Sequence, residues 1–360
     1  MFAMTRPFVA FHFGLVQDVA VLRPLVRLAA SSPSTNIHLL VTSKLPELDA
    51  DGRWMAEIER LGAEIGVTPS IYESAFDCLN LLGPGSGLLI AGSESDARAH
   101  SQAHQLFQTV PGRYLTATLQ HGLEFVGFLH NARHDATAGR AVKFAADIAV
   151  SWFDLDRASS VSATEQSKIF VAGPTAMIEP MRRAGDGGNG LPPLICENLH
   201  SVRFVNGRMR EAFLDTFMDF AARLQMVGER LTLRPHPAGR FTDRKGVVLP
   251  DNVEVSRDPL YDMDLGAFSY VISAPSTILF DFALVGVPAA TWVDGNGHVD
   301  ARNFAGLPQV ASVDDWWRFH WAARWERRAL VDAQEGFVTR QAIPGNVRER
   351  YEELLAMASS

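Results

Sequence analysis

The chain has little cysteine and no excess of positive charge. Cys78 and Cys196 lie in different halves of the 360 residues, and no Cys/His cluster has the spacing of a zinc site. A disulfide framework and a structural metal centre are therefore both unsupported. The 33 basic and 41 acidic residues give a net charge of −8, which argues against a nucleic-acid binder that works through bulk charge.

Long hydrophobic runs are also missing. No segment approaches the ~20 consecutive apolar residues that a transmembrane helix needs. Residues 1–7 lead into a short apolar strand instead of a signal peptide. Together with the scarce cysteine, this predicts a cytoplasmic protein. The composition, 47% hydrophobic and 21% charged, excludes wholesale disorder, and the length suggests two domains.

Two nucleotide-binding motifs are missing from the places where they act. Only Gly14 follows the first apolar run, where a dinucleotide-binding enzyme carries GxGxxG, and the P-loop motif GxxxxGK[ST] does not occur. A hydride-transferring Rossmann enzyme and a P-loop NTPase therefore both lose their strongest sequence support. We expect no cofactor.

What the first half does contain is an alternation of short apolar runs with amphipathic segments. Strands that alternate with helices of this length imply parallel βαβ units, because a parallel pair of strands requires a crossover connection. The pattern predicts strands at 8–13, 37–42, 87–92, 114–119, 146–152 and 168–172, and helices at 19–28, 54–61, 71–82 and 99–110.

A Gly- and Pro-rich segment, residues 174–193, interrupts this pattern, and we interpret it as a linker. The alternation then resumes, with strands predicted at 194–196, 230–233, 253–255, 270–272 and 289–293, and helices at 207–224 and 276–285. We therefore predict an α/β protein with two Rossmann-like, doubly wound domains that face a cleft. They span 1–173 and 194–330, and a helical segment, 331–360, follows. Ligands of such sheets bind at the carboxyl ends of the strands.

His121 is the first candidate site residue at a strand end. It follows the apolar run 114–119 and Gln120, and Gly122 permits a sharp turn of the backbone. An imidazole at this position suits general-base catalysis near neutral pH. The structural alternative is a histidine that is hydrogen-bonded within a loop.

A second strand end carries Arg234-Pro235-His236-Pro237. The two prolines hold His236 in an extended turn that cannot continue as a helix or an internal strand. A preorganised imidazole beside the Arg234 guanidinium suits binding of a phosphate. The alternative is a rigid structural turn.

A third strand end carries Pro275-Ser276-Thr277, which suits the opening of a helix. Hydroxyl and backbone N–H groups would then lie at the positive end of that helix and form an anion site. Ordinary N-capping by Ser276 or Thr277 is the alternative. Asp281, one turn further on, either orients the loop or a ligand or is a plain helical carboxylate.

The fourth strand end places Glu197, Asn198, His200 and Arg203 after the first strand of the second half. Arg203 would neutralise phosphate, and Glu197 would bind a sugar hydroxyl or act as an acid or base. Asn198 and His200 would support them. A purely structural role of these four residues is the alternative.

The order of these motifs, Gln120-His121-Gly122, Arg234-Pro235-His236-Pro237 and Pro275-Ser276-Thr277 with Asp281, resembles the GT-B glycosyltransferases. More narrowly, it resembles the CDP-glycerol glycerophosphotransferases and the capsule sialyl- and Kdo-transferases. In those families an HG motif supplies a catalytic base, and an HP motif and a Ser-Ser/Thr motif hold the nucleotide phosphate. The resemblance therefore implies that His121 is the base and that His236, Ser276 and Thr277 bind the donor phosphate. With Arg234 or Arg203 adding positive charge, a metal ion is expected to be dispensable.

Ala274-Pro275-Ser276-Thr277 stands where the glycerophosphotransferases usually have a tyrosine and paired serines, which favours a sugar transferase. The resemblance implies transfer from a nucleotide-activated donor, such as CMP-Kdo or CMP-sialate, to a cell-envelope polysaccharide or a lipid-linked glycan. The alternatives are a CDP-polyol phosphotransferase of the teichoic-acid type, a non-hydrolysing nucleotide-sugar epimerase, and a non-catalytic glycan- or nucleotide-binding module. The epimerase would need carboxylates around the sugar ring, for which Glu197 and Glu124 are the candidates.

Trp317, Trp321 and Trp325 recur every four residues near the C-terminus. Such a stripe usually packs against the protein itself, and this is the expectation. The alternative is a peripheral contact with the inner face of the membrane, which would suit a lipid-linked acceptor.

Overall fold

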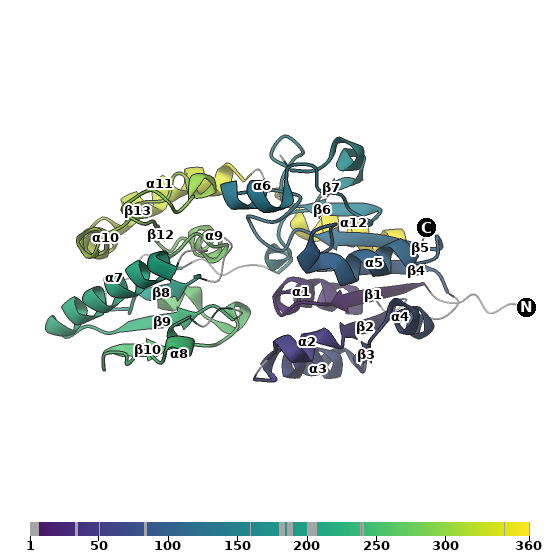
Figure 1. Ribbon diagram of the computed structural model, residues 1–360, viewed down its shortest axis with the longest axis horizontal. Coiled ribbons are helices and arrows are strands. Elements are labelled where there is room, and N and C mark those ends of the chain that lie inside the picture. Colours follow the sequence, from purple (N-terminus) through teal and green to yellow (C-terminus); the bar gives the residue numbers. More distant parts are fainter. Residues whose placement is uncertain are drawn as a thin grey trace, which may run out of the picture. The chain divides into compact units, whose positions relative to one another are not determined.

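The computed structural model describes residues 7–32, 35–49, 51–82, 85–158, 160–179, 184–185, 190–199, 207–237, 239, 241–341 and 343–359. The chain divides into two compact units, whose helices and strands are labelled in Figure 1. The first unit consists of Met1–His130, Asp135–Pro180 and Ala342–Ser360. The second consists of Asn131–His134 and Met181–Gln341.

In the described part of the first unit, parallel strands form one sheet in the order β3-β2-β1-β4-β5-β6-β7. Their bounds are β1 Phe8–Phe13, β2 Asn36–Thr42, β3 Ser70–Tyr72, β4 Gly87–Ala91, β5 Tyr114–Leu119, β6 Ile148–Ser151 and β7 Ile169–Val171. The chain runs outward from β1 to β3 and then returns to place β4 beside β1. The strand order therefore switches between β1 and β4, which is where ligands of such sheets bind.

The core of the first unit explains its sequence pattern. β1 and β4 are buried along their whole length, so they are near-continuous apolar runs without alternation. Apolar residues of one sheet face pack with helices that include Leu25, Ile58 and Leu354. The helices grouped with this unit are α1 Asp18–Ala30, α2 Lys44–Leu48, α3 Arg53–Ile65, α4 Ala75–Leu82, α5 Ser101–Thr109 and α12 Val347–Ala356.

The second unit repeats this topology in its described residues, with parallel strands in the order β10-β9-β8-β11-β12-β13. The strands are β8 Leu194–Glu197, β9 Leu231–Pro235, β10 Val253–Val255, β11 Val271–Ser273, β12 Ala289–Trp292 and β13 Gln309–Val310. The helices are α7 Gly207–Met226, α8 Phe241–Lys245, α9 Ile278–Leu284, α10 Val313–Trp325 and α11 Arg327–Thr339. The order switches between β8 and β11. Helix α6 Ala132–Ala138 has residues in both units.

The predicted alternation of strands and helices is confirmed, with several local differences. The helix expected at 71–82 starts only at Ala75, because residues 70–72 pair with β2 as an edge strand. The helix expected at 54–61 is longer than predicted: α3 continues to Ile65 and is capped by Gly66 in the left-handed conformation (φ 73°). Strand β13 has no counterpart among the predicted elements. Within the expected linker, residues 180–183 and 186–189 lie outside the described residues.

The unit boundaries also differ from the expected domains. The second unit extends to Gln341, beyond the expected end at 330, and residues 342–360 group with the first unit. The cause is packing: Val347, Tyr351 and Leu354 of α12 are buried in the first core. The Tyr351 hydroxyl also donates a hydrogen bond to the carbonyl oxygen of Gly173 (2.8 Å). No helix in the described ranges is both long enough and apolar enough to cross a lipid bilayer.

Candidate functional site

His121 lies in a turn directly after β5, and buried Gln120 holds this turn. Gln120 is 2% exposed, and its side-chain nitrogen donates to the carbonyl oxygens of Gly122 (2.9 Å) and Leu123 (3.2 Å). Its side-chain oxygen accepts a hydrogen bond from the backbone nitrogen of Trp152 (2.9 Å). His121 itself is half-buried. The imidazole is therefore carried on a turn whose backbone is fixed by buried hydrogen bonds.

A chain of hydrogen bonds links His121 to two residues at the β1–β4 switch point. Ser93 Oγ lies 3.1 Å from His121 Nδ1 and donates to Asp18 Oδ1 (2.9 Å). Asp18 Oδ2 accepts hydrogen bonds from the backbone nitrogens of Gly14 (2.9 Å) and Leu15 (2.8 Å). Asp18 and Ser93 are 1% and 4% exposed. The half-buried imidazole is therefore hydrogen-bonded to a buried hydroxyl, which is in turn hydrogen-bonded to a buried carboxyl.

Burial changes the chemistry of Asp18. It raises the pKa of Asp18 to about 6, although the hydrogen bonds from Gly14, Leu15 and Ser93 favour the ionised form. The close approach depends on Gly92, because a Cβ atom there would lie 2.5 Å from Asp18 Oδ1. Asp18 is therefore ionised above neutral pH and protonated in mild acid.

The His121 ring also packs against Phe125. The two ring centroids are 4.0 Å apart, and Phe125 also contacts the ring of His100 at 5.1 Å. His100 Nδ1 lies 2.6 Å from the hydroxyl of Ser95. The packing against Phe125 and the contact with the Ser93 hydroxyl together restrict rotation of the His121 ring.

A second buried carboxylate, Glu94, anchors the loop after β4. Its side chain is 2.5 Å from His104 Nδ1 and accepts hydrogen bonds from the backbone nitrogens of Ala145 (3.0 Å) and Ala146 (3.2 Å). Burial raises the pKa of Glu94, and the bonds from Ala145, His104 and Ala146 oppose this shift. Glu94 therefore fixes the loop that carries its neighbour Ser93.

At the switch point of the second unit, Asn198 joins the two strand ends. Its side-chain nitrogen donates to the carbonyl oxygen of Pro275 (2.7 Å), and Asn198 is 8% exposed. Ser276 and Thr277, both half-buried, follow directly in the chain. Asn198 therefore positions the turn that presents the two predicted phosphate-binding hydroxyls.

The helix after this turn is shorter than expected. Predicted at 276–285, it is observed as α9 and has 7 residues. Its dipole is correspondingly small, so the argument for an anion site at the helix start loses force. The Thr277 side chain makes no capping hydrogen bond to α9, so ordinary N-capping does not explain Thr277 either. Ser276 and Thr277 remain candidate ligands through their hydroxyls.

The HP motif lies at the end of β9. His236 is half-buried, and its backbone nitrogen donates to the carbonyl oxygen of Glu197 (3.2 Å) while its carbonyl oxygen accepts from Gly239 N (3.0 Å). Arg234 is 9% exposed and donates to the carbonyl oxygen of Asp258 (3.4 Å). The backbone around His236 is thus fixed on both sides, and Arg234 is less accessible than its predicted phosphate-binding role suggested.

Asp281 is a carboxyl of the second unit whose pKa is shifted by its surroundings. Burial raises its pKa to about 7, and the positive charge of Arg234 partly opposes the shift. Asp281 is half-buried and lies on α9, one turn after Thr277. It therefore titrates near neutral pH, unlike the plain helical carboxylate of the structural alternative.

Glu197 has a different position from the one its sequence neighbours suggested. It is 1% exposed, and its carboxylate accepts hydrogen bonds from the backbone nitrogen of Phe241, the backbone nitrogen of Thr242 (2.9 Å) and the Thr242 hydroxyl. Successive strand residues point to opposite faces, so Glu197 and Cys196, the register partner of Arg234, face opposite sides of the sheet. This geometry makes Glu197 an anchor of α8 and argues against its expected acid/base role, which stays an untested prediction.

Other predictions have mixed outcomes. His200 and Arg203 lie outside the described residues. In α10, Trp317 packs against the second core, whereas Trp321 and Trp325 are 37% and 74% exposed. The packing expectation therefore holds for Trp317, and a membrane contact stays the untested alternative for the other two rings.

Acidic pairs that could serve as metal ligands are present in the sequence. Asp-X-Asp tripeptides occur at 49–51, 154–156 and 262–264. No group of three or more His, Cys, Asp or Glu side chains is placed to hold a metal ion in the part of the chain that the structure describes. Metal independence stays a prediction, based on the side chains that are predicted to bind phosphate, and assays with a chelator test it directly.

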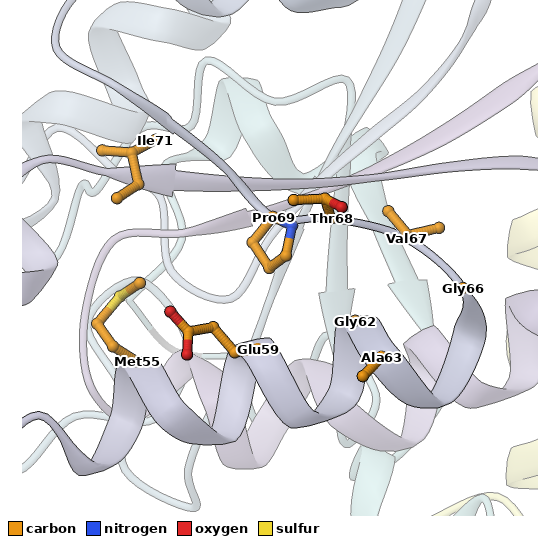
Figure 2. Close-up of a pocket in the computed structure, with 9 residues that line it drawn as sticks. All are labelled: Met55, Glu59, Gly62, Ala63, Gly66, Val67, Thr68, Pro69 and Ile71. Atoms are coloured by element: carbon orange, nitrogen blue, oxygen red, sulfur yellow. The ribbon is translucent and has the colours of Figure 1, made fainter.

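A surface groove of about 400 Å³ lies in the first unit between α3 and the segment that leads into β3 (Figure 2). Its lining is mostly small or apolar and includes a single charged side chain, Glu59, among the residues Met55, Glu59, Gly62, Ala63, Gly66, Val67, Thr68, Pro69 and Ile71. Binding sites bring several polar groups to bear on a ligand. The groove contains none of the strand-end residues, and we assign it no ligand.

Sequence reasoning missed Asp18 and Ser93. Asp18 is the first residue of α1, four residues after Gly14, and Ser93 follows Gly92, which comes directly after β4. The signal that would find them is a glycine at a strand end with a polar residue nearby, at two strands that flank a switch point. That signal needs the strand order, which the sequence pattern does not supply.

No family model and no curated protein matches the sequence. Solved structures do match the fold. A UDP-N-acetylglucosamine 2-epimerase from Neisseria meningitidis, bound to UDP-GlcNAc, is 11% identical, with a TM-score of 0.58 over 97% of this chain and 99% of that one. The glycotransferase of kitacinnamycin is 13% identical, with a TM-score of 0.57 over 98% and 99%.

A third structure, a putative UDP-N-acetylglucosamine 2-epimerase from Listeria monocytogenes, is 12% identical, with a TM-score of 0.60 over 98% of this chain and 96% of that one. Likenesses at this identity establish the fold alone. The predicted fold class is confirmed: the chain has two Rossmann-like parallel α/β units, as expected for a GT-B protein.

Proposed function

We propose that this protein is a glycosyltransferase that uses a nucleotide-activated sugar, with His121 as the general base. The observation that carries the proposal is the hydrogen-bonded chain Asp18–Ser93–His121, which holds a half-buried imidazole at the switch point of the first unit. In a general base of this kind, the imidazole accepts the proton, and a hydroxyl and a carboxyl hydrogen-bonded behind it hold it in position. The first unit would therefore serve the acceptor.

The second unit would bind the donor. His236 and the hydroxyls of Ser276 and Thr277 are its half-buried candidates for the phosphate, and Arg234 adds positive charge behind them. Asn198 holds the turn of Ser276 and Thr277 in place. Negative charge builds up on the nucleotide phosphate as its bond to the sugar breaks, so donors aimed there stabilise the transition state.

In the proposed reaction, the acceptor hydroxyl oxygen forms a bond to the anomeric carbon of the sugar. The bond between that carbon and the phosphate oxygen breaks, and its electron pair leaves with the nucleotide. His121 takes the proton of the hydroxyl. Asp281 would support the donor, as its place one turn after Thr277 suggests.

The donor and the acceptor are the finer part of the proposal. The sequence resemblance favours a cytidine nucleotide, whereas two similar structures are described as complexes with UDP and with UDP-GlcNAc. We retain a cell-envelope polysaccharide or a lipid-linked glycan as the acceptor class. Thermal-shift measurements with CMP, CDP, UDP, GDP and ADP separate the bases, because a ligand that binds the native state raises the melting temperature. Stabilisation by a purine nucleotide alone would contradict the pyrimidine donor.

A nucleotide-sugar 2-epimerase is the second candidate, because several similar structures are named as such. The geometry weakens it, since Glu197, one of the two carboxylates expected near the sugar ring, is committed to Phe241 and Thr242. Incubation with UDP-GlcNAc and no acceptor distinguishes the two. An epimerase converts the sugar at C2 under these conditions, whereas a transferase gives no isomer and needs an acceptor.

A further inference from the structure

The Asp18–Ser93–His121 chain has a direction, because its middle member has one hydrogen to donate. A serine hydroxyl donates one hydrogen bond and can accept others. Ser93 Oγ contacts Asp18 Oδ1 on one side (2.9 Å) and His121 Nδ1 on the other (3.1 Å). Only one of these two neighbours can receive the hydroxyl proton. The protonation of the neighbours therefore decides which way the chain runs.

We propose that Asp18 and Ser93 are positioning residues that set the tautomer of His121, with the proton on Nδ1 and the lone pair on Nε2. The catalytic consequence rests on the proposed function, because Nε2 would then be the atom that accepts the proton of the acceptor hydroxyl. The tautomer itself is a property of the protein without substrate.

The direction of the hydrogen bonds in this chain follows from the carboxylate of Asp18. An ionised carboxylate only accepts hydrogen bonds. Asp18 Oδ2 already accepts from the backbone nitrogens of Gly14 and Leu15, and Oδ1 faces Ser93. The Ser93 proton must then point to Asp18, and its oxygen accepts a hydrogen bond from His121. That bond requires a proton on Nδ1.

The surroundings keep this arrangement in place. Asp18 and Ser93 are buried, so water does not compete for their hydrogen bonds. Phe125 packs against the His121 ring. Tyr72 interacts electrostatically with Asp18, and burial keeps the Tyr72 hydroxyl protonated by raising its pKa. The serine bridge thus does for His121 what a carboxylate in direct contact does in a catalytic triad.

Replacing Asp18 with asparagine reverses the chain without changing its shape. The asparagine oxygen would accept from the backbone nitrogens of Gly14 and Leu15, and its NH2 group would donate to Ser93 Oγ. The Ser93 proton would then point to His121, whose Nδ1 must become an acceptor. The variant is therefore expected to place the proton on Nε2.

Nitrogen NMR of histidine-labelled protein tests this inference directly. The long-range correlations of an imidazole distinguish the two neutral tautomers, and loss of one ring system in His121→Ala assigns His121. At about pH 8 we expect Nδ1–H in the wild type and Nε2–H in Asp18→Asn. Nε2–H in the wild type, or Nδ1–H retained in the variant, would overturn the proposal.

Two matched controls separate positioning from general damage. Asp49→Asn alters another buried carboxylate of the first unit, which accepts from Met55 N (2.8 Å) and has no hydrogen bond to His121. Ser95→Ala removes a hydroxyl that contacts His100. Both should leave the His121 tautomer unchanged. If Asp18→Asn does not fold, Ser93→Ala takes its place and should give a mixture of tautomers; a retained Nδ1–H signal there contradicts the proposal.

Enzyme kinetics test the catalytic consequence of the His121 tautomer separately. Once a transfer assay is available, Asp18→Asn should lower kcat by about 100-fold with little change in KM, and it should displace the limb of the pH profile that reports the base. A correct tautomer with no transferase activity would sink the proposed function and leave the positioning role standing. An active transferase whose His121 carries its proton on Nε2 would contradict the positioning role and leave the proposed function standing.

Discussion

The two units share one topology, yet their switch points are joined by different chemistry. In the first, a carboxylate and a hydroxyl bridge β1 and β4 and extend to the His121 ring. In the second, Asn198 bridges β8 and β11 by donating to a backbone carbonyl oxygen. The first arrangement controls a proton on a side chain, and the second controls the shape of a turn. The comparison teaches that a repeated fold supports two different tasks when the bridging residue changes.

The largest effect is expected from replacing His121, the last residue of the hydrogen-bonded chain at the switch point of the first unit. His121→Ala should lower the transfer rate by about 1,000-fold, because general-base catalysis typically contributes factors of 100 to 10,000. Nucleotide binding, measured by thermal shift, should be unchanged. His38→Ala, a half-buried histidine of the same unit, is the matched control. A His121 variant with full transfer activity would remove His121 from the role of general base.

The second largest effect is expected from replacing His236 in the second unit. His236→Ala should weaken binding of the preferred nucleotide by about 10- to 100-fold, since a hydrogen bond to a charged group contributes about 1.5–3 kcal/mol. Calorimetric titration measures this change, and His298→Ala in the same unit should have no effect. Unaltered affinity in the His236 variant would remove this residue from the phosphate site.

Replacing Glu197 tests whether this residue has a structural role or belongs to the active site. Glu197→Gln replaces one acceptor oxygen with a donor that faces the N–H groups of α8, so the free energy of unfolding should fall by about 1–3 kcal/mol. The transfer rate should remain near that of the wild type once the protein is folded. Chemical denaturation and the transfer assay together check this. A stable variant with lost turnover would restore the acid/base role.

The smallest expected effect concerns the charge of Asp281. Its pKa of about 7 in the folded protein lies above the ordinary value of 3.8, so the folded state holds a proton that the unfolded state has lost. The free energy of unfolding should therefore fall as the pH rises from about 4 to about 7. Asp281→Asn should remove this part of the pH dependence, on the order of 1–2 kcal/mol after allowance for partial exposure. Denaturant melts across this range measure it, and an unchanged pH dependence would contradict the shift.

Local pattern predicted much of the fold, because burial on both faces of a parallel sheet leaves continuous apolar runs. The strand predicted at 8–13 is observed as β1 with the same bounds, and the one at 114–119 as β5. It also singled out His121, because a polar residue after an apolar strand is a local signal. It did not distinguish Glu197 from a site residue, since the partners of Glu197 lie more than 40 positions away in the sequence, 44 and 45 residues for Phe241 and Thr242.

By itself, the sequence determined the two-unit α/β class, the strand-end motifs and the exclusion of several protein classes, because these depend on composition and on short-range periodicity. The tertiary structure alone decided which of those residues have partners. Asp18 and Ser93 are 75 positions apart and meet only because the chain returns from β3 to place β4 beside β1. Strand order is set by long-range packing, and for that reason the proton chain behind His121 is visible in the fold and not in the sequence.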